Sequence, residues 1–289
     1  MDLEKQRQMA AFIAERNNRD EHHVGYCGTN EEEILQTLQS EFSDIGLEEC
    51  FSIVEQDGNI KALLGCDIDV LEKTAELWGP FVADTSGNEQ MALDVWKELT
   101  GKIGNRISTY YGFYNIQNEN GNRLMKAIGA VRRNDRQLIM EVEGTGSTVS
   151  RSAVVPYQQS HQQAFHLLHS STFPVTYYNS SAILEKLDDS HMLYVYVYNG
   201  LVAGYIYFVA HEADGTGSIE YLGVDPVFRK RGIGTSLLQK AREMLCEEKR
   251  VEKLSICVSE KNKGAVAVYR KAGFEIKHTL YSYKKAAVE

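Results

Sequence analysis

The sequence predicts an α/β fold in two tandem domains, each a twisted, mixed and largely antiparallel sheet flanked by helices. Three observations lead to this prediction. Asn199-Gly200 stands between two runs of alternating tyrosines and valines, which is typical of a β-hairpin. An apolar strand at residues 219–224 is followed by a glycine-containing turn and an amphipathic helix. The first half repeats landmarks of the second at a shift of 144 residues, as tandem copies of one fold would.

Strand and helix signals alternate through the second half. Predicted strands lie at residues 154–157, 194–210 (as a hairpin), 219–224, 253–259 and in final strands that end at residue 283. Predicted helices lie at residues 161–170, 180–187, 235–248 and 263–272. The apolar stretch 193–210 is long enough to span a membrane, but Asn199-Gly200 interrupts it, so we interpret it as two strands.

The turn that precedes the 235–248 helix has an unusual composition. Three cationic side chains, Arg229, Lys230 and Arg231, are followed by two glycines, Gly232 and Gly234. The helix N-terminus offers free backbone N–H groups at the positive end of its dipole, where a pyrophosphate binds well. Glycine lets the backbone approach phosphate oxygens closely. Taken alone, the turn also fits a basic loop that only caps a helix.

A second block follows the predicted strand at 253–259. Asn262 is suited to cap a helix N-terminus, and Gly273 stands where a helix commonly ends. Tyr269 lies between them, in the pattern Asn-x-x-Ala-x-x-x-Tyr followed by Gly-Phe. The block therefore places a capping asparagine and a tyrosine in one short helix.

Together the two blocks resemble the GNAT superfamily of acyl-CoA-dependent N-acetyltransferases. The family's pyrophosphate loop has the pattern Arg/Gln-x-x-Gly-x-Gly/Ala, and its last acyl-CoA-binding block is similar to residues 262–274. The resemblance covers residues from about 151 to 285. It implies acetyl-CoA as the cosubstrate, with no metal. The acetyl-CoA-binding residues that it implies are Leu222, Gly223, Val224, Arg229, Lys230, Arg231, Gly232, Ile233, Gly234, Thr235 and Asn262.

The resemblance also implies catalytic roles. Backbone N–H groups near Leu222 and Val224, freed where their strand diverges from the next, would bind the pantetheine arm and polarise the thioester carbonyl. Tyr269 would protonate the leaving thiolate, although a tyrosine in this helix could instead pack in the core. Glu220 is the candidate base, acting directly or through water, because strand alternation puts it on the face of Leu222 and Val224. The alternative for Glu220 is an exposed carboxylate without a catalytic role.

The first half is expected to be a degenerate GNAT-like copy. At the shift of 144 residues, Asn118 coincides with Asn262 and Gly79 with Gly223, while the helix after residue 89 loses phase. We expect a degenerate domain at residues 1–146 and a catalytic domain at 147–289, joined by a flexible segment near 144–148.

Three requirements for acetyl-CoA binding and transfer fail together in the first half. Residues 85–90, which correspond to the cationic loop, contain no cation. Met125 coincides with Tyr269 and cannot donate a proton, and Pro80 coincides with Val224 and has no backbone N–H. The first domain is therefore expected not to bind acetyl-CoA in the usual way. We expect it instead to form a wall of the acceptor cleft or to stabilise the pair of domains.

Charge is divided unevenly along the chain. Residues 1–144 hold 14 Lys and Arg against 26 Asp and Glu, whereas residues 145–289 hold 17 against 14. The basic surplus of the second half suits a polyanionic cosubstrate. The acidic first half argues against nucleic acid as a partner.

Cysteine and histidine usage indicates a reduced protein without a metal site. The five cysteines form no CxxC pair and are odd in number, and the N-terminus lacks an apolar signal region, so we expect a cytoplasmic protein that does not enter a membrane. The histidines at positions 161, 166 and 169 fall in one predicted helix and those at 22 and 23 in a loop, and neither spacing fits a metal site well.

The predicted function is transfer of the acetyl group of acetyl-CoA to a primary amine of a small molecule or peptide. Polyamines, amino sugars, amino acids and protein N-termini all stay open as acceptors, and so does assembly as a homodimer. The alternative function is a catalytically silent acyl-CoA sensor or partner-binding protein, against which Tyr269 argues because a sensor needs no proton donor.

Overall fold

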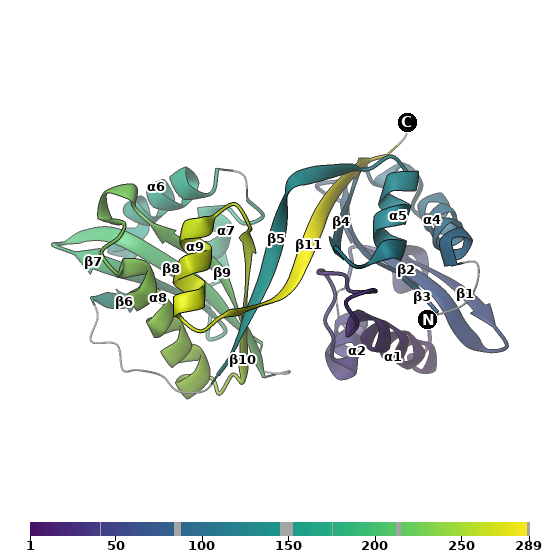
Figure 1. Ribbon diagram of the computed structural model, residues 1–289, viewed down its shortest axis with the longest axis horizontal. Coiled ribbons are helices and arrows are strands. Elements are labelled where there is room, and N and C mark those ends of the chain that lie inside the picture. The colour runs from purple at the N-terminus through teal and green to yellow at the C-terminus, as the bar shows by residue number, and fades with distance from the viewer. Residues whose placement is uncertain (41, 84–87, 145–152, 175, 212–214, 288–289) are drawn as a thin grey trace. The chain divides into compact units, whose positions relative to one another are not determined.

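The computed structural model describes the chain except for residues 41, 84–87, 145–152, 175, 212–214 and 288–289 (Figure 1). The chain divides into two compact units, the first made of Met1–Gln137 with His278–Glu289 and the second of Leu138–Lys277. Most of the expected linker at 144–148 lies outside the described residues. No helix in the described ranges is both long and apolar enough to cross a membrane.

The first unit is a mixed sheet with strand order β1-β2-β3-β4-β11. Its strands are β1 (Phe51–Gln56), β2 (Asn59–Asp69), β3 (Thr74–Val82), β4 (Thr109–Asn115) and the C-terminal part of β11 (Glu275–Ala286). Its helices are α1 (Leu3–Asn17), α2 (Glu31–Gln39), α3 (Leu47–Cys50), α4 (Asn88–Ile103) and α5 (Glu119–Ala127). Neighbouring strands pair antiparallel, except that β3 and β4 are parallel.

The second unit has strand order β5-β10-β9-β8-β7-β6. Its strands are β5 (Val131–Glu143), which begins in the first unit, β6 (Val154–Pro156), β7 (His191–Tyr198), β8 (Leu201–His211), β9 (Thr216–Val224) and β10 (Lys253–Ser259). Its helices are α6 (Gln162–Thr172), α7 (Ser180–Glu185), α8 (Ile233–Arg242) with a π-helical turn at Glu243–Glu248, and α9 (Lys263–Lys271). Each element predicted for this half is present, with small shifts at its ends and a single last strand.

Each unit receives a strand from the other half of the chain. β11 enters the first unit at His278, and its residues Leu280 to Ala286 pair with β4. β5 enters the second unit at Leu138 and lies next to β10. The compact units therefore differ from the division at residue 146, which left all of β11 in the second domain, because linear order does not show this exchange.

The two units repeat one order of elements, but the offset between them changes along the chain. β2 and β3 correspond to β8 and β9 at an offset of 142 residues, whereas β4 and α5 correspond to β10 and α9 at 144. The change arises before the central helix, since α4 and α8 begin 145 residues apart, at Asn88 and Ile233, and the offset then falls by one residue before β4 and β10. The ungapped shift of 144 therefore aligned Pro80 with Val224, whereas the strands align Pro80 with Leu222.

Two apolar clusters lie on opposite faces of the sheet in the second unit. One packs beneath α8 and α9 and includes Leu237 and Tyr269. The other packs beneath α6 and α7 and includes Phe165 and Tyr205. Burying a side chain such as Leu237 or Phe165 contributes roughly 1.5–3 kcal/mol. These clusters fix β9 between two layers of helices.

Candidate active site

The strands β9 and β10 separate in the second unit. They pair in parallel from Thr216 and Lys253 to Ile219 and Ile256. β9 continues to Val224 and stays paired with β8 along that length, but the described part of β10 pairs with none of its later residues. An opening is thus left along one edge of the C-terminal half of β9.

The backbone N–H groups of Leu222 and Val224 face this opening. The N–H of Asp225 donates to the carbonyl oxygen of Ala203 on β8 at 3.0 Å. Backbone groups alternate between the two edges of a strand, so Gly223 also faces β8, while Leu222 and Val224 face the β10 side. This is the geometry that the family resemblance implies for holding an acyl-CoA arm.

The loop after β9 leads into α8 with its first N–H groups exposed to an incoming anion. Lys230 and Gly232 have positive φ values of 61° and 81°, and Gly232 at the N-cap has no side chain to bond those groups. The bond from the N–H of Ser236 to the carbonyl oxygen of Gly232, 3.0 Å, begins the helix. The N–H groups that precede Ser236 therefore point out of the helix end, as a pyrophosphate site requires.

Two of the three loop cations are held in place. The Nε of Arg229 donates to the carbonyl oxygen of Val224 at 3.0 Å. The guanidinium carbon of Arg231 lies 5.8 Å from the ring centroids of both Tyr198 and Phe228, which is a cation–π distance. All three cationic side chains are exposed, so their charge is available at the loop.

Gly234 marks where the loop, β9 and α9 meet. A Cβ atom built on Gly234 would lie 3.8 Å from Cγ2 of Val224, 3.9 Å from Cδ2 of Leu222 and 3.9 Å from Cγ1 of Val268. The N-terminus of α8 therefore lies in van der Waals reach of side chains at the open edge of β9 and of α9, the helix that carries Tyr269.

Tyr269 lies on α9 and is 5% exposed. Burial raises the pKa of Tyr269 well above its usual range, and Cys257 adds to the shift, so the hydroxyl keeps its proton at neutral pH. Asn262 accepts a hydrogen bond from the N–H of Ala265 at 3.2 Å and caps α9. A contact of Asn262 with acyl-CoA stays a prediction.

Glu220 is the extra residue of a β-bulge. Tyr207 of β8 pairs with Tyr221, and the next residue, Phe208, pairs with Ile219, so the ladder skips Glu220. A bulge leaves one residue without a partner and redirects its side chain. The side chain of Glu220 is exposed.

The bulge changes the face on which Glu220 lies. Ser218, paired with Val209 of the cluster beneath α6 and α7, donates its hydroxyl to the Glu220 carboxylate at 2.5 Å. Leu222 and Val224 pack against the opposite cluster. The expected shared face is therefore wrong, because the bulge shifts the alternation by one residue and turns Glu220 toward the α6 and α7 side.

Cys257 is a member of the site that sequence reasoning missed. It follows Ile256, the last paired residue of β10, and interacts electrostatically with both Glu220 and Tyr269. Although the Cys257 residue is exposed to solvent, desolvation by the protein atoms around its thiol, and secondarily the Glu220 carboxylate, raises the pKa of that thiol to about 12. The thiol is thus neutral at pH 7 and a weak nucleophile. Only the strand register could have pointed to it.

The face beneath α6 and α7 carries hydrogen-bonded aromatic side chains. Nδ1 of His169 lies 2.6 Å from the hydroxyl of Tyr205, and its Nε2 lies 2.9 Å from the carbonyl oxygen of Tyr178. Burial lowers the pKa of His169, so the neutral ring donates from Nε2 to the carbonyl. His169 therefore connects α6 to β8.

Among the described residues, His, Cys, Asp and Glu form no group of three that could hold a metal ion.

The matching place in the first unit has a different chemistry. Pro80 occupies the position of Leu222 and has no N–H to face an acyl arm. Met125, which is fully buried, occupies the position of Tyr269 on the corresponding helix. The predicted loop at residues 85–90 lies partly outside the described residues.

Comparison with known proteins identifies the family. Residues 158–274 match the acetyltransferase (GNAT) family. An acetyltransferase of Yersinia pestis (strain Pestoides F) is 31% identical over 102 residues, which are 35% of this chain and 70% of that protein. The chain belongs to the GNAT family of acetyltransferases. For other curated relatives the matched share of their length is smaller: it is 44% of an uncharacterized Bacillus subtilis protein and 65% of a probable N-acetyltransferase of Drosophila melanogaster.

Solved structures share the fold over nearly the whole chain. A GCN5-related N-acetyltransferase from Sphaerobacter thermophilus superposes with a TM-score of 0.73 at 18% identity, covering 99% of this chain and 94% of that one. A tandem GNAT protein from the clavulanic acid biosynthesis pathway gives 0.66 at 13% identity, covering 100% and 96%. The predicted tandem GNAT fold is thereby confirmed.

Proposed function

We propose that the second unit transfers the acetyl group of acetyl-CoA to a primary amine of a small molecule or peptide. The observation that carries this proposal is the separation of β9 from β10 beyond Ile219 and Ile256, next to a helix N-terminus without a side-chain cap. The free N–H groups of β9 and the anion-binding N-terminus of α8 thus both lie near the C-terminal end of β9. Acetyl-CoA, a thioester that also carries a pyrophosphate, needs both kinds of group.

In this proposal the cosubstrate is held at two places. The pyrophosphate accepts hydrogen bonds from the first N–H groups of α8, with Arg229, Lys230 and Arg231 supplying opposite charge. The pantetheine arm lies along the open edge of β9, where the N–H groups of Leu222 and Val224 donate to its carbonyls. One of these N–H groups also stabilises the negative oxygen that forms when the thioester is attacked.

The proposed reaction is direct transfer. The acceptor amine attacks the thioester carbonyl carbon, the new C–N bond forms, and the amine proton passes to Glu220 directly or through water. The C–S bond then breaks, and the thiolate of CoA takes a proton from Tyr269. Glu220 faces α6 and α7, so the acceptor is expected on that side of β9. The neutral state of Tyr269 supports its part in this scheme.

We propose that the first unit does not bind acetyl-CoA. Pro80 and Met125 replace two of the groups that the second unit offers to the cosubstrate. We therefore keep the functional division into a degenerate first domain and a catalytic second one. The five free cysteines support a reducing, cytoplasmic setting for both.

Thiol release tests the proposed function. The full chain is incubated with acetyl-CoA and a panel of polyamines, amino sugars, amino acids and peptides, and free CoA thiol is measured against a reaction without acceptor. Acceptor-dependent release that the Tyr269→Phe variant loses is the expected result. Tight acetyl-CoA binding with no release for any amine would favour the silent acyl-CoA sensor instead.

A further inference from the structure

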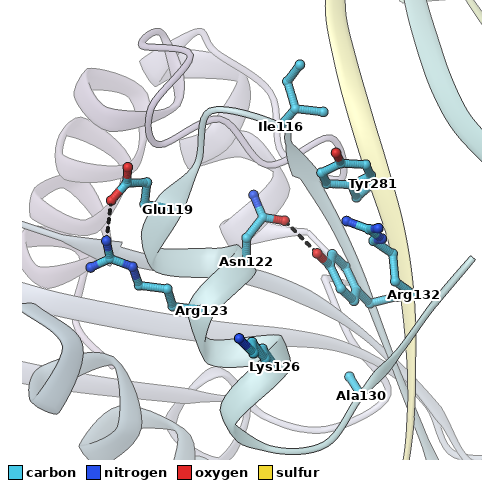
Figure 2. Close-up of a pocket in the computed structure, with 9 residues that line it drawn as sticks. Ile116, Glu119, Asn122, Arg123, Lys126, Ala130, Arg132 and Tyr281 are labelled. Carbon is cyan, nitrogen blue, oxygen red and sulfur yellow. Dashed lines mark hydrogen bonds and ion pairs between the residues drawn. The ribbon is translucent and has the colours of Figure 1, made fainter.

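The first unit contains a pocket that is lined by none of the residues that the proposed function uses. Its volume is about 550 Å³, which lies in the range of small-molecule sites. α5, the first residues of β5 and the C-terminal part of β11 form its walls (Figure 2). All the residues that line it belong to the first unit.

The pocket is positively charged within an acidic half of the chain. Arg123 is neutralised by an ion pair with Glu119 at 2.6 Å. Lys126 and Arg132 also line the pocket, and neither forms an ion pair with a carboxylate in the described part of the chain. Two cationic charges thus remain, although residues 1–144 have 12 more acidic than basic side chains (26 against 14).

Arg132 is held in position at the wall. Its guanidinium carbon lies 4.3 Å from the centroid of the Tyr281 ring, a close cation–π contact. It also interacts with the hydroxyl of Tyr283, whose proton is donated to Oδ1 of Asn122 at 2.8 Å. A guanidinium fixed in this way loses little freedom when it binds an oxyanion, and its fork geometry suits two oxygens at once.

Asn122 is fixed as well. Its Nδ2 donates to the carbonyl oxygens of Asn115 and Asn118, at 3.0 Å and 2.7 Å, while Oδ1 accepts from Tyr283. The polar wall of the pocket is therefore built before any ligand arrives, which lowers the entropic cost of binding.

The second unit shows that the fold does not impose this lining. α5 and α9 correspond residue by residue, since Asn118 and Asn262 cap them in the same way. At that offset of 144 residues, Asn122 corresponds to Val266 and Arg123 to Ala267. Lys126 corresponds to Arg270, so a cation at this position is common to both copies. The polar side chains of Asn122 and Arg123 are therefore the part of this helix that is peculiar to the first copy, the copy that lacks the acetyl-CoA groups.

We propose that this pocket binds a small organic molecule with a doubly charged oxyanion, either a phosphate monoester or a dicarboxylate. Arg132 engages the anion through paired N–H groups, and Lys126 supplies the second charge. The remaining volume, beyond what a bare anion fills, accommodates the organic part. The site is separate from acetyl-CoA chemistry, so it can be present whether or not the proposed function holds.

Isothermal titration calorimetry on the full chain tests this site. The probes are glycerol 3-phosphate, succinate and, as the uncharged control, glycerol. The wild-type protein is expected to bind at least one dianion and not glycerol, and the Lys126→Ala/Arg132→Ala double variant to bind it about 10-fold more weakly or worse. The milder Arg132→Gln variant, with an unchanged far-ultraviolet circular dichroism spectrum, guards against misfolding. Arg133→Ala removes the neighbouring exposed cation and is the matched control, expected to bind as wild type.

The outcomes separate the candidates. Binding of the phosphate ester alone assigns a phosphate monoester, and binding of succinate alone assigns a dicarboxylate. The proposal is overturned if neither dianion binds at about 10 mM, or if Arg133→Ala weakens binding as much as the double variant does. Binding that is lost in Arg231→Ala but kept in the double variant would place the anion at the α8 loop and also overturn it.

Discussion

Ile219 of β9 and Ile256 of β10 form the last residue pair of the parallel ladder between these strands. β9 continues to Val224, and after the cationic loop α8 begins at Ile233 without a side-chain cap. The first unit has the same strands, but Pro80 interrupts the equivalent edge. This difference leads to a prediction about stoichiometry.

One acetyl-CoA molecule is expected to bind per chain, because the first unit has Pro80 in the strand that corresponds to β9 and its sequence has no cation at residues 85–90. Calorimetric titration of the full chain with acetyl-CoA measures the number of sites. Arg231→Ala should weaken the single event about 10-fold, the effect of one charged hydrogen bond. Two equivalent sites per chain would contradict the proposed degeneracy of the first unit.

Tyr269→Phe is expected to keep acetyl-CoA binding and to lower kcat by ~10²–10⁴-fold, since it removes the proposed proton donor while the ring still packs. Steady-state kinetics and calorimetry measure the two quantities. Tyr111→Phe in the first unit is the control and should change neither. An unchanged kcat in Tyr269→Phe would remove this residue from the mechanism.

Glu220→Gln is expected to lower kcat/KM by ~10²-fold or more if the carboxylate takes the amine proton. Ser218→Ala removes the hydrogen bond to the carboxylate, together with the 3.1 Å contact between the Ser218 hydroxyl and Nε2 of His211, but keeps the carboxylate, so it should have a much smaller effect. Initial rates over a range of acceptor concentrations provide the comparison. Equal effects of the two variants would indicate that the bulge, and not the carboxylate, matters.

Cys257→Ala is expected to change kcat by less than about threefold, because a thiol whose pKa is raised to about 12 stays protonated and is a poor nucleophile. Mass spectrometry of the wild-type chain after incubation with acetyl-CoA alone should show no acetylated cysteine. Acetyl transfer to Cys257, together with loss of turnover in the variant, would replace direct transfer by a two-step route.

Glu76→Gln is expected to stabilise the protein at alkaline pH. Burial, and then the charge of Asp67 directly opposite on β2, raises the pKa of Glu76 from 4.5 to about 7. The folded state thus binds this proton more tightly than the unfolded state, so the free energy of unfolding falls as pH rises from about 4.5 to 7. A neutral amide avoids that loss, which gives the variant roughly 1–3 kcal/mol of extra stability at pH 8.

Urea unfolding at pH 5 and pH 8 checks this prediction. The gain of Glu76→Gln should shrink toward zero at pH 5, where wild-type Glu76 is protonated in the folded state. The exposed Glu72→Gln is the control and should show no such pH dependence. A gain of the same size at both pH values would mean that the charge of Glu76 is not its cause.

The order of elements could be predicted from the sequence because local signals carry it. The hairpin at Asn199-Gly200, the cap at Asn262 and the glycine at 273 are all read from residues close together in the chain, and each lies in the structure where its element turns, begins or ends. The cationic loop and the tyrosine block sufficed for the family, since their chemistry resides in residue types at fixed spacing.

Register could not be predicted in the same way. Strand alternation placed Glu220 on the face of Leu222, but hydrogen bonding with β8 creates a bulge that reverses it. An ungapped shift matched Pro80 to Val224 because loop lengths before the central helix differ between the copies. Cys257 could not be predicted as a site residue because its position depends on where the pairing between β9 and β10 ends.

By itself the sequence determined the fold class, the family and which copy keeps the loop cations, Gly232 and Tyr269. These properties follow from residue identity and short-range spacing. Only the tertiary structure decided that β5 and β11 each complete the sheet of the other half, that β9 and β10 part after Ile219, and that Arg132 meets Tyr281 in a pocket. Those facts depend on hydrogen bonds and contacts between residues far apart in the chain, where no local pattern records which partner is chosen.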